Sequence, residues 1–412
     1  MMKNVQPPYY DAFLNRRHFT PQRLPMLAPG TGGALAAILA VCDLQSRPYQ
    51  RHVVCRAIEL LGGVARDDQG HHIAPLDRVL IDSPHGSGKM LMGLTIATLL
   101  QRSTGCRVGW ASRRPDRRTQ ASAENRARGL GVRLQTLAID DRQETPMDLL
   151  IIDAVEREDG AAIESLRDHY QPHWTIGLST SPGRGDRNRW LDHKHWPAQG
   201  MIRSQPTATL IEQGYLSRYR HLTLDQYTPA EIAHWLINAP QRFGKSLIYS
   251  DNRRDADLLY LLLRQAGIRC HVMSMADDPA DQVRAGQQQE FVAGQVDHLI
   301  SLSPHVDDLA FPDLQTVFCR PAGKRCTLQM AGPVLRPSVR VPVKQIVQCR
   351  QTACPFPTIA APTEQLSLDP QRTLVSSDSE TRPANSPQRA LLNHFRKPRV
   401  GFAVPLTPFP IR

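Results

Sequence analysis

The stretch "RVLIDSPHGSGKMLMGLTIATLL", residues 78–100, decides the fold. An apolar, strand-like run leads into a short turn that contains Gly86 and Gly88, and a helix-like run follows at once. In this context glycines let backbone N–H groups turn inward and surround phosphate oxygens at the positive end of the helix. Lys89 is placed to reach the terminal phosphates of a nucleotide. The stretch therefore predicts a phosphate-binding loop between a strand and a helix.

Two positions in this loop depart from the usual pattern. Met90 stands where a serine or threonine would supply a hydroxyl to Mg²⁺, and Ser83 replaces the first glycine. A thioether has no useful affinity for that hard cation. The loop thus predicts ATP as a ligand while arguing against Mg²⁺.

Strand-like and helix-like segments alternate on both sides of the loop. Examples are "RVGWAS", "DLLIID" and "TIGLSTS" before residue 200, and "KSLIYSD" and "LQTVFCRP" after residue 244. Apolar strands that alternate with helices are typical of parallel sheets covered on both faces. The helix "DADLLYLLLRQAG" is expected to bury Leu258, Leu259, Leu262 and Leu263 against the second sheet. We therefore predict an α/β chain with two parallel-sheet domains in tandem.

Composition shifts mark five segments along the chain. They are an N-terminal extension (1–44), a first domain (45–203), a bridge (204–241), a second domain (242–337) and a Pro/Ser/Gln-rich tail (338–412) that is expected to be disordered.

The net charge and the cysteines indicate which binding partners and which cellular compartment to expect. Among 412 residues, 50 Lys and Arg face 39 Asp and Glu, a net charge of +11 that favours polyanionic partners. The longest apolar run, residues 32–42, is too short to span a bilayer, and the opening residues carry no secretory cleavage site. The eight cysteines are scattered, which predicts a reducing cytoplasm and no zinc site.

A series of short elements resembles the motifs of superfamily 2 helicases of the DEAD/DEAH type, in the branch of restriction-enzyme subunits and phage-type DNA helicases. The elements are "RPYQ" (47–50), "SPHGSGKM" (83–90), "WASRRPDRRTQ" (110–120), "LLIIDAVE" (149–156), "LSTSP" (178–182), "LIEQGYLSRY" (210–219) and "TLQMAGPVLRP" (327–337). The resemblance covers roughly residues 45–337. It implies two RecA-like lobes that hold ATP between them and bind a nucleic-acid strand across their tops.

The resemblance also implies roles for individual residues. Gln50 would read the adenine, while Gly86, Ser87, Gly88 and Lys89 would hold the phosphates. Asp153, Gln329 and Arg336 would be the remnants of the hydrolytic centre. The residues implied to contact the nucleic-acid backbone are Arg113, Arg114, Arg117, Arg118, Arg184 and Arg187.

Several catalytic positions depart from the family pattern. Ala154 stands where a glutamate would activate water, and such a general base is worth ~10²–10⁴ in rate. Pro333 replaces an arginine whose counterparts in phosphoryl transfer contribute ~10³–10⁵. Asp308 and Ala310 take the places of a glycine and an aspartate in the second lobe. The losses converge on hydrolysis and spare the apolar segments that build the lobes.

The sequence therefore predicts a helicase-like module of a larger DNA- or RNA-processing complex, with a nucleotide-binding loop but impaired hydrolysis. DNA is favoured over RNA, other proteins are expected as partners, and no membrane is involved. One alternative is an active ATP-dependent DNA helicase in which Glu156 or Glu158 replaces the lost base. A second alternative is a protein-binding scaffold that does not bind nucleic acid.

Overall fold

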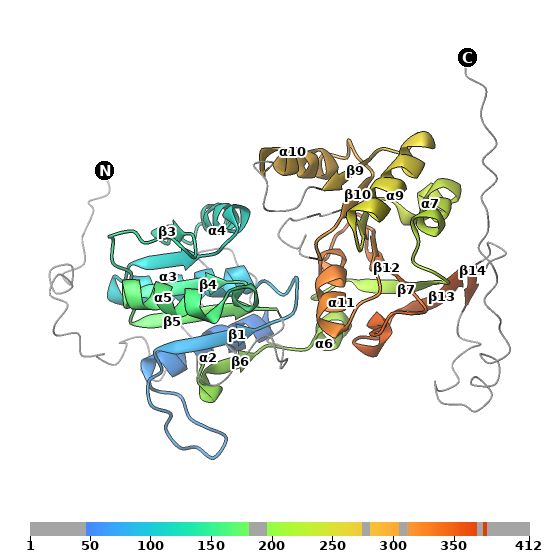
Figure 1. The fold of residues 1–412 in the computed structure, drawn as a ribbon. Helices are drawn as coiled ribbons and strands as arrows, with labels where there is room; N and C mark the ends of the chain where they lie inside the picture. The colour runs from blue at the N-terminus through green and yellow to red at the C-terminus, as the bar shows by residue number, and fades with distance from the viewer. Residues whose placement is uncertain are drawn as a thin grey trace, which may run out of the picture.

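A computed structural model describes residues 47–180, 196–273, 281–304, 311, 313–368 and 374–376. These residues form two α/β lobes joined by a linker that carries helix α6 (Thr207–Glu212) (Figure 1). The fold class predicted from the sequence is confirmed, since each lobe is built on a parallel sheet. The predictions for the N-terminal extension, for Arg184 and Arg187, and for Asp308 and Ala310 lie outside the described residues.

The first lobe is built on a six-stranded sheet of order β3-β2-β4-β5-β1-β6, with every pair parallel. The strands are β1 (Arg78–Asp82), β2 (Val108–Ala111), β3 (Leu134–Leu137), β4 (Leu149–Asp153), β5 (Trp174–Ser179) and β6 (Met201–Arg203). The phosphate loop follows β1, and β5 separates β1 from β4. The carboxyl ends of these three strands therefore meet at one edge of the sheet.

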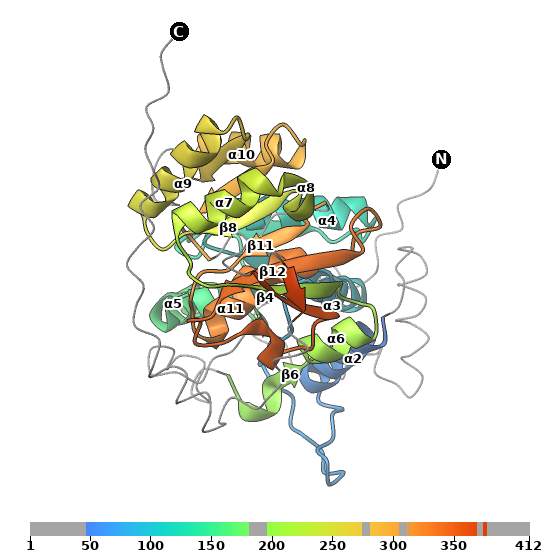
Figure 2. The same cartoon turned by 90° about the vertical axis from the view of Figure 1, so that its right-hand side faces the viewer.

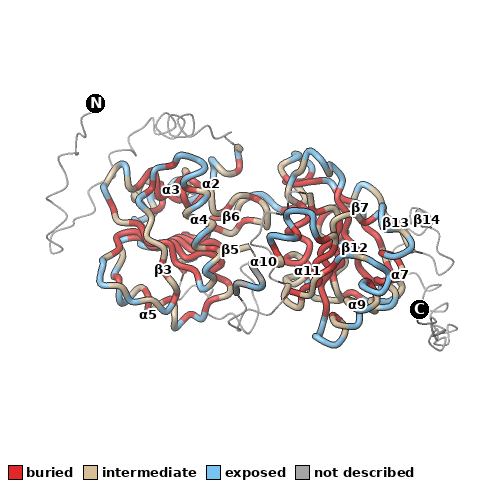
Figure 3. The backbone as a smooth tube through the Cα atoms, turned by 90° about the horizontal axis from the view of Figure 1, so that it is seen from above, coloured by how far each residue is buried: buried red, intermediate tan, exposed pale blue. Residues whose placement is uncertain are grey.

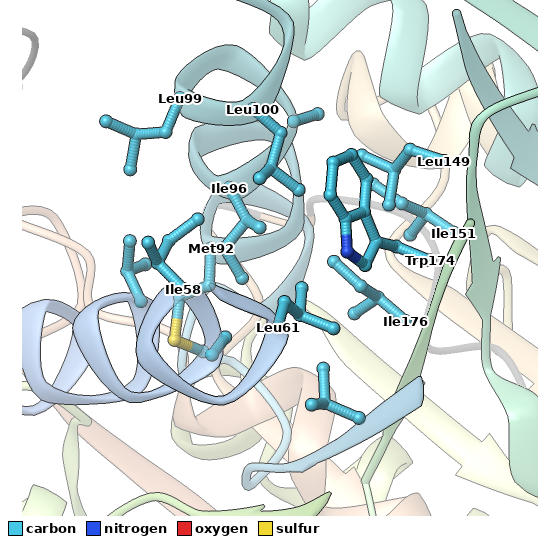
Figure 4. Close-up of a cluster of buried hydrophobic side chains, with 14 of the residues drawn as sticks. Ile58, Leu61, Met92, Ile96, Leu99, Leu100, Leu149, Ile151, Trp174 and Ile176 are labelled. Atoms are coloured by element: carbon cyan, nitrogen blue, oxygen red, sulfur yellow. The ribbon is translucent and has the colours of Figure 1, made fainter. Parts of the chain in front are cut away.

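Helices cover both faces of this sheet. They are α2 (Pro48–Gly62), α3 (Lys89–Thr104), α4 (Pro115–Ala127) and α5 (Gly160–Tyr170). Along β1, Val79 and Ile81 join the core under α2 and α3, while Leu80 joins the core under α5. Figure 4 shows the first of these cores, where Ile58 of α2 and Met92 of α3 lie close to each other. Burial on both faces explains why the strands are apolar throughout.

The second lobe has an eight-stranded sheet of order β14-β13-β7-β12-β11-β8-β10-β9, in which only β13 and β14 pair antiparallel. The strands are β7 (Arg218–Leu224), β8 (Ser246–Tyr249), β9 (Cys270–Met273), β10 (His298–Ser301), β11 (Thr316–Phe318), β12 (Val343–Cys349), β13 (Glu364–Leu368) and β14 (Leu374–Ser376). In the tube coloured by burial, both sheets form the buried centres of their lobes (Figure 3).

Two predicted boundaries of the second lobe are wrong. The strand β7 comes from the segment predicted as a bridge, and β12 and β13 come from the segment predicted as a disordered tail. Because β12 pairs with β7 over seven residues and also with β11, it lies inside the sheet. The second lobe therefore extends well beyond residue 337.

Helices flank the second sheet on both faces (Figure 2). They are α7 (Pro229–Asn238), α8 (Pro240–Phe243), α9 (Arg253–Gln265), α10 (Asp281–Val292) and α11 (Lys324–Ala331). On α9, Leu259 and Leu263 are buried as predicted. Leu258 is 46% exposed, so its predicted burial is wrong; the helix turns that side chain toward solvent.

Within the described part of the chain, every helix is too short or too polar to span a bilayer.

Candidate nucleotide and nucleic-acid site

The phosphate loop joins the end of β1 to the start of α3. Gly86 and Gly88 adopt left-handed backbone angles, with φ of 74° and 87°. Residues with a Cβ adopt such angles at a cost, which explains why glycines occupy both places. The loop thus has the local geometry that the sequence predicts.

Lys89 is folded back into the loop. The side chain is buried, and Nζ donates hydrogen bonds to the carbonyl oxygens of Ser83 at 3.0 Å and Pro84 at 2.9 Å. An ammonium group on a flexible stem can exchange these carbonyls for phosphate oxygens without moving the backbone. Lys89 is therefore positioned to hold a phosphate at the start of α3.

The side chains of Tyr49 and Gln50 cover the loop from helix α2. Both donate to the carbonyl oxygen of Ser87, from Tyr49 Oη at 2.7 Å and from Gln50 Nε2 at 2.8 Å. A methyl group added at Gly88 would lie 2.5 Å from Gln50 Nε2, so the amide of Gln50 would have to move to make room for it. Gln50 thus lies at the loop, and its role in reading adenine stays a prediction.

Met90 does not face a metal site. Its side chain is partly buried and packs against the hydrophobic core of the first lobe. The thioether is thereby part of the packing of α3, and no hydroxyl stands in its place. This residue does not fit a bound Mg²⁺.

Asp153, at the end of β4, is paired with an arginine. The guanidinium of Arg117, on α4, donates from Nη1 to both carboxylate oxygens of Asp153, at 3.3 Å and 3.2 Å. Both side chains are buried. Of the four arginines in "SRRPDRR", Arg117 is thus turned inward and cannot offer its charge to a nucleic-acid backbone in this structure.

Ala154 follows Asp153 with φ of 58°, a left-handed conformation that costs a residue with a Cβ about 1–2 kcal/mol. The turn places Glu156 inside the lobe, where Oε1 accepts a hydrogen bond from the hydroxyl of Thr180 at 2.6 Å. Its other oxygen, Oε2, is buried and accepts no hydrogen bond from the described residues.

The charge state of Glu156 follows from its neighbours. Burial raises the pKa of this carboxyl. The hydrogen bond from Thr180 and the positive charges of Arg157 and Lys89 together lower the pKa by more than burial raises it, so it lies below the usual value. Glu156 is therefore ionised at neutral pH and forms a buried anion close to the phosphate loop.

Glu158 is held by a different arginine. Nε of Arg113 donates to its Oε2 at 3.1 Å, and Glu158 is buried while Arg113 is largely exposed. Burial raises the pKa of Glu158, and Arg113 only partly offsets this effect. Glu158 is thus engaged in an ion pair with Arg113, the residue two positions before the start of α4.

The second lobe contributes helix α11 and the 3₁₀ turn η6 (Gly332–Leu335) that follows it. Pro333 lies in the first turn of η6, so the regular helix ends at Ala331. Gln329 is buried, and its Nε2 donates no hydrogen bond within the described residues. Arg336 follows η6, and its side chain lies near Gly86 of the phosphate loop. Gln329 and Arg336 therefore both reach the boundary between the lobes.

Further contacts join the lobes at this boundary. The imidazole of His85 lies so close to Gly332 that a methyl group added there would overlap its ring. Arg325, on α11, donates from Nη2 to the carbonyl oxygen of Glu156 at 2.8 Å. The rings of Tyr49 and Tyr215 pack with their centroids 5.2 Å apart. The phosphate loop and the strand end at Asp153 are thus in direct contact with the second lobe.

A cavity of about 340 Å³ lies between the lobes. Its lining includes Asp82, His85 and Thr180 from the first lobe and Lys324 and Gln329 from the second. Burial raises the pKa of Asp82 to about 6, although Arg203 and Lys89 oppose the shift. The cavity is therefore lined mainly by apolar surface, with polar side chains from both lobes and the Asp82 carboxyl among its lining groups.

The remaining arginines of the predicted nucleic-acid patch are accessible to different degrees. Arg113 is exposed, Arg114 pairs with Asp116 on the first turn of α4, and Arg118 donates to the carbonyl oxygen of Ser112 at 2.6 Å. These three arginines stay candidates for contacts to the nucleic-acid backbone.

Sequence reasoning missed His85, Arg325 and Thr180 as members of the site. Their contacts cross between segments that are far apart in the chain, and no local pattern marks such residues. For Thr180 a signal existed, because it lies in the "LSTSP" element directly after β5.

No protein-family model matches the sequence, and no curated protein is similar to it by sequence. The fold nevertheless matches solved structures. S. cerevisiae Dbp5 bound to RNA and ADP BeF3 has a TM-score of 0.54 at 12% identity, over 81% of this chain and 92% of that chain. The ATP-dependent type ISP restriction-modification enzyme LlaBIII bound to DNA has a TM-score of 0.50 at 11% identity, over 74% of this chain but only 27% of its own.

At these identities the likeness concerns the fold alone. It agrees with the two tandem α/β lobes, each built on a largely parallel sheet. The chain therefore has the two-lobed fold of these solved structures, with two tandem RecA-like domains.

Proposed function

We propose that this protein binds nucleic acid and holds a nucleotide at its phosphate loop, but hydrolyses ATP slowly or not at all. We further propose that it works as a module of a larger complex that processes DNA or RNA. The observation that carries the proposal is the state of Asp153: its carboxylate is bound on both oxygens by Arg117 and is followed by Ala154 instead of a glutamate.

Nucleotide binding is supported by what remains of the cradle. Gly86 and Gly88 keep the backbone in the required turn, and Lys89 and Arg336 supply positive charge from the two lobes. The Dbp5 structure contains ADP BeF3, which makes a nucleotide a reasonable ligand for a site of this fold. The bound nucleotide would act here as a structural ligand between the lobes.

Nucleic-acid binding is supported by charge and by the neighbouring structures. Arg113, Arg114 and Arg118 lie together at the start of α4, and the net charge of the chain is +11. One solved neighbour is bound to RNA and the other to DNA. We retain DNA as the favoured ligand, and binding to matched DNA and RNA strands distinguishes the two.

A role within a complex is supported by the exposed face of α9. Leu258 and Leu261 are 46% and 54% exposed on neighbouring turns of this helix. Apolar side chains presented together on a surface are typical of contacts with other proteins.

Turnover of ATP by the purified protein tests the proposal, measured with and without single-stranded DNA or RNA. We expect no turnover above that of a Lys89→Ala control. We also expect ATP or ADP to raise the melting temperature of the wild-type protein, because a ligand that binds only the folded state stabilises it. Stimulated turnover that depends on Lys89 would contradict the proposal.

One observation favours the alternative of an active helicase. Glu156 is ionised, and its Oε2 has no hydrogen-bond partner among the described residues, so this oxygen could accept a proton from water. Glu158 does not share this property, because Arg113 binds it. A Glu156→Gln variant separates the cases, since an active enzyme using this base would lose its turnover.

A further inference from the structure

We propose that the guanidinium of Arg117 occupies the place of the divalent cation at this site, so that the phosphate loop binds a nucleoside di- or triphosphate without a metal ion. The inference rests on the proposed function in one respect, namely that the loop binds a nucleotide. It goes further by naming the residue that replaces the metal and the form in which the ligand is bound.

The geometry of the Arg117–Asp153 pair carries the inference. Asp153 ends β4, beside the strand that precedes Thr180, and is 1% exposed. Nη1 of Arg117 donates to both of its oxygens. A carboxylate that accepts hydrogen bonds from a cation on both oxygens has little capacity left to orient the water shell of a second cation. The pair therefore excludes a metal ion, because Arg117 already binds the Asp153 carboxylate that would hold the ion.

Arg117 is expected to stay charged and paired with Asp153 in the folded protein. A guanidinium stays charged at any pH at which the protein is folded. Breaking a buried pair by removing one partner leaves an uncompensated charge, which is strongly destabilising. Arg117 lies in the first turn of helix α4, and its side chain pairs with Asp153 at the end of β4. The packing of α4 therefore keeps the guanidinium in place.

The second position that would bind a metal has also changed. Met90, the first residue after Lys89, packs on the core of the first lobe and has no oxygen to offer. The anchor carboxylate and the anchor hydroxyl are thus both unsuitable for Mg²⁺, by two independent means.

The local charge fits an anion that arrives without its metal. The positive charges of Lys89, Arg336, Arg117 and Arg157 all lie near the imidazole of His85, whose ring nitrogens are buried. Together with burial, which has the largest effect, they hold its pKa well below the usual value. The carboxylates of Asp82, Asp153 and Glu156 lie among these cations, and Glu158, which interacts with Arg157, is paired with Arg113. Four cationic side chains from the two lobes therefore gather where the phosphate loop meets the second lobe.

The experiment measures ADP and ATP binding by calorimetry in excess EDTA and in excess Mg²⁺. We expect the two dissociation constants of the wild-type protein to agree within about twofold. Arg117→Met should weaken binding in EDTA by about tenfold, since a charge beside the phosphates is lost. Arg126→Met removes an exposed charge from the same helix and should change nothing.

A second variant guards against misfolding. Arg117→Met leaves Asp153 without its partner, whereas Arg117→Met combined with Asp153→Asn removes both charges and should fold. The double variant should bind ADP in EDTA more weakly than the wild-type protein, because the guanidinium donors are absent, but less weakly than Arg117→Met alone, because the negative charge of Asp153 is also gone. Affinity equal to that of the wild type would contradict a role for Arg117 in binding.

Direct observation of a metal completes the test. Mn²⁺ added with ADP is followed by electron paramagnetic resonance. We expect no bound Mn²⁺ in the wild-type protein or in Met90→Thr, because Arg117 still holds Asp153. We expect bound Mn²⁺ in Met90→Thr combined with Arg117→Met, in which the hydroxyl and the carboxylate are both available.

The outcomes separate this inference from the proposed function. Wild-type binding that requires Mg²⁺, or Mn²⁺ bound by Met90→Thr alone, would overturn the replacement of the metal and leave the proposed function standing. Absence of nucleotide binding in both EDTA and Mg²⁺ would overturn both.

Discussion

The imidazole of His85, in the phosphate loop, packs directly against the backbone of Gly332, at the start of the 3₁₀ turn η6 in the second lobe. The backbone of Gly332 is helical, with φ of −53°, so an alanine would be tolerated there by the backbone itself. The atoms nearest to such a methyl group belong to the side chain of His85. The two residues therefore determine how closely the lobes can approach at this point.

Gly332→Ala is expected to destabilise the protein by roughly 1–3 kcal/mol, because the added methyl overpacks a buried contact. His85→Ala in the same chain should remove most of this penalty. Urea unfolding of the two single variants and the double variant measures the coupling. Additive effects would show that the lobes do not meet at these residues in solution.

Arg325→Ala removes the hydrogen bond that α11 donates to the carbonyl oxygen of Glu156. A hydrogen bond from a charged donor contributes about 1.5–3 kcal/mol, so the lobes should separate more often. Small-angle X-ray scattering should show a larger radius of gyration than that of the wild-type protein. Arg264→Ala, an exposed arginine on α9, is the control and should leave the radius unchanged.

Hydrolysis is expected to return only when Asp153 is released. Met90→Thr, Ala154→Glu and Pro333→Arg together restore the missing hydroxyl, base and cation. With Arg117 still bound to Asp153, this triple variant should remain slow. Adding Arg117→Ala should raise the rate of phosphate release by at least about tenfold, since the acidic anchor becomes available. An equally fast triple variant would show that Arg117 does not obstruct the site.

The stability of the protein should depend on pH through Asp82. Burial raises the pKa of its carboxyl from 3.8 to about 6 in the folded state. Between these values the folded state binds more protons than the unfolded state, so Asp82 makes the free energy of unfolding fall as pH rises. Asp82→Asn should therefore stabilise the protein at pH 7, by on the order of 1 kcal/mol after discounting for partial exposure. Urea unfolding between pH 4 and pH 7.5 checks this, and a variant less stable than the wild type at pH 7 would contradict it.

Nucleic-acid binding should weaken steeply with salt and depend on the arginines at the start of α4. Replacing Arg113, Arg114 and Arg118 with alanine should reduce the slope of log K against log salt concentration by about 0.7–0.9 for each phosphate that the protein no longer neutralises. Arg126→Ala, at the other end of the same helix, is the matched control. Fluorescence anisotropy with a labelled single strand gives both slopes, and equal slopes would exclude these arginines from the interface.

Local signals predicted the elements that carry the fold. The strand–turn–helix around the phosphate loop and the apolar strands of both lobes are visible in short windows of sequence, because burial on both faces demands continuous apolar runs. The strands β7 and β12 were missed because "RYRHLTL" and "VKQIVQC" mix polar and apolar residues. Their place in the sheet depends on pairing between segments that lie far apart in the chain.

The arrangement of the site was less accessible to sequence reasoning. Nothing in "SRRPDRR" distinguishes Arg117 from its three neighbours, although only Arg117 turns inward to Asp153. The reason is the phase of α4 against the sheet, which only the packed structure reveals. The same holds for α9. Its leucines correctly predicted a buried face that includes Leu259 and Leu263, but Leu258 was wrongly included in that face.

The pairing of β12 with β7 and β11 has a practical consequence for anyone who prepares fragments of this chain. A fragment that stops at residue 337, where the helicase-like motifs end, would lack the interior strand β12. The neighbouring strands β7 and β11 would then have unpaired edges, which promote aggregation. Such a fragment would precipitate for reasons unrelated to its chemistry, and its inactivity would be mistaken for a property of the native protein.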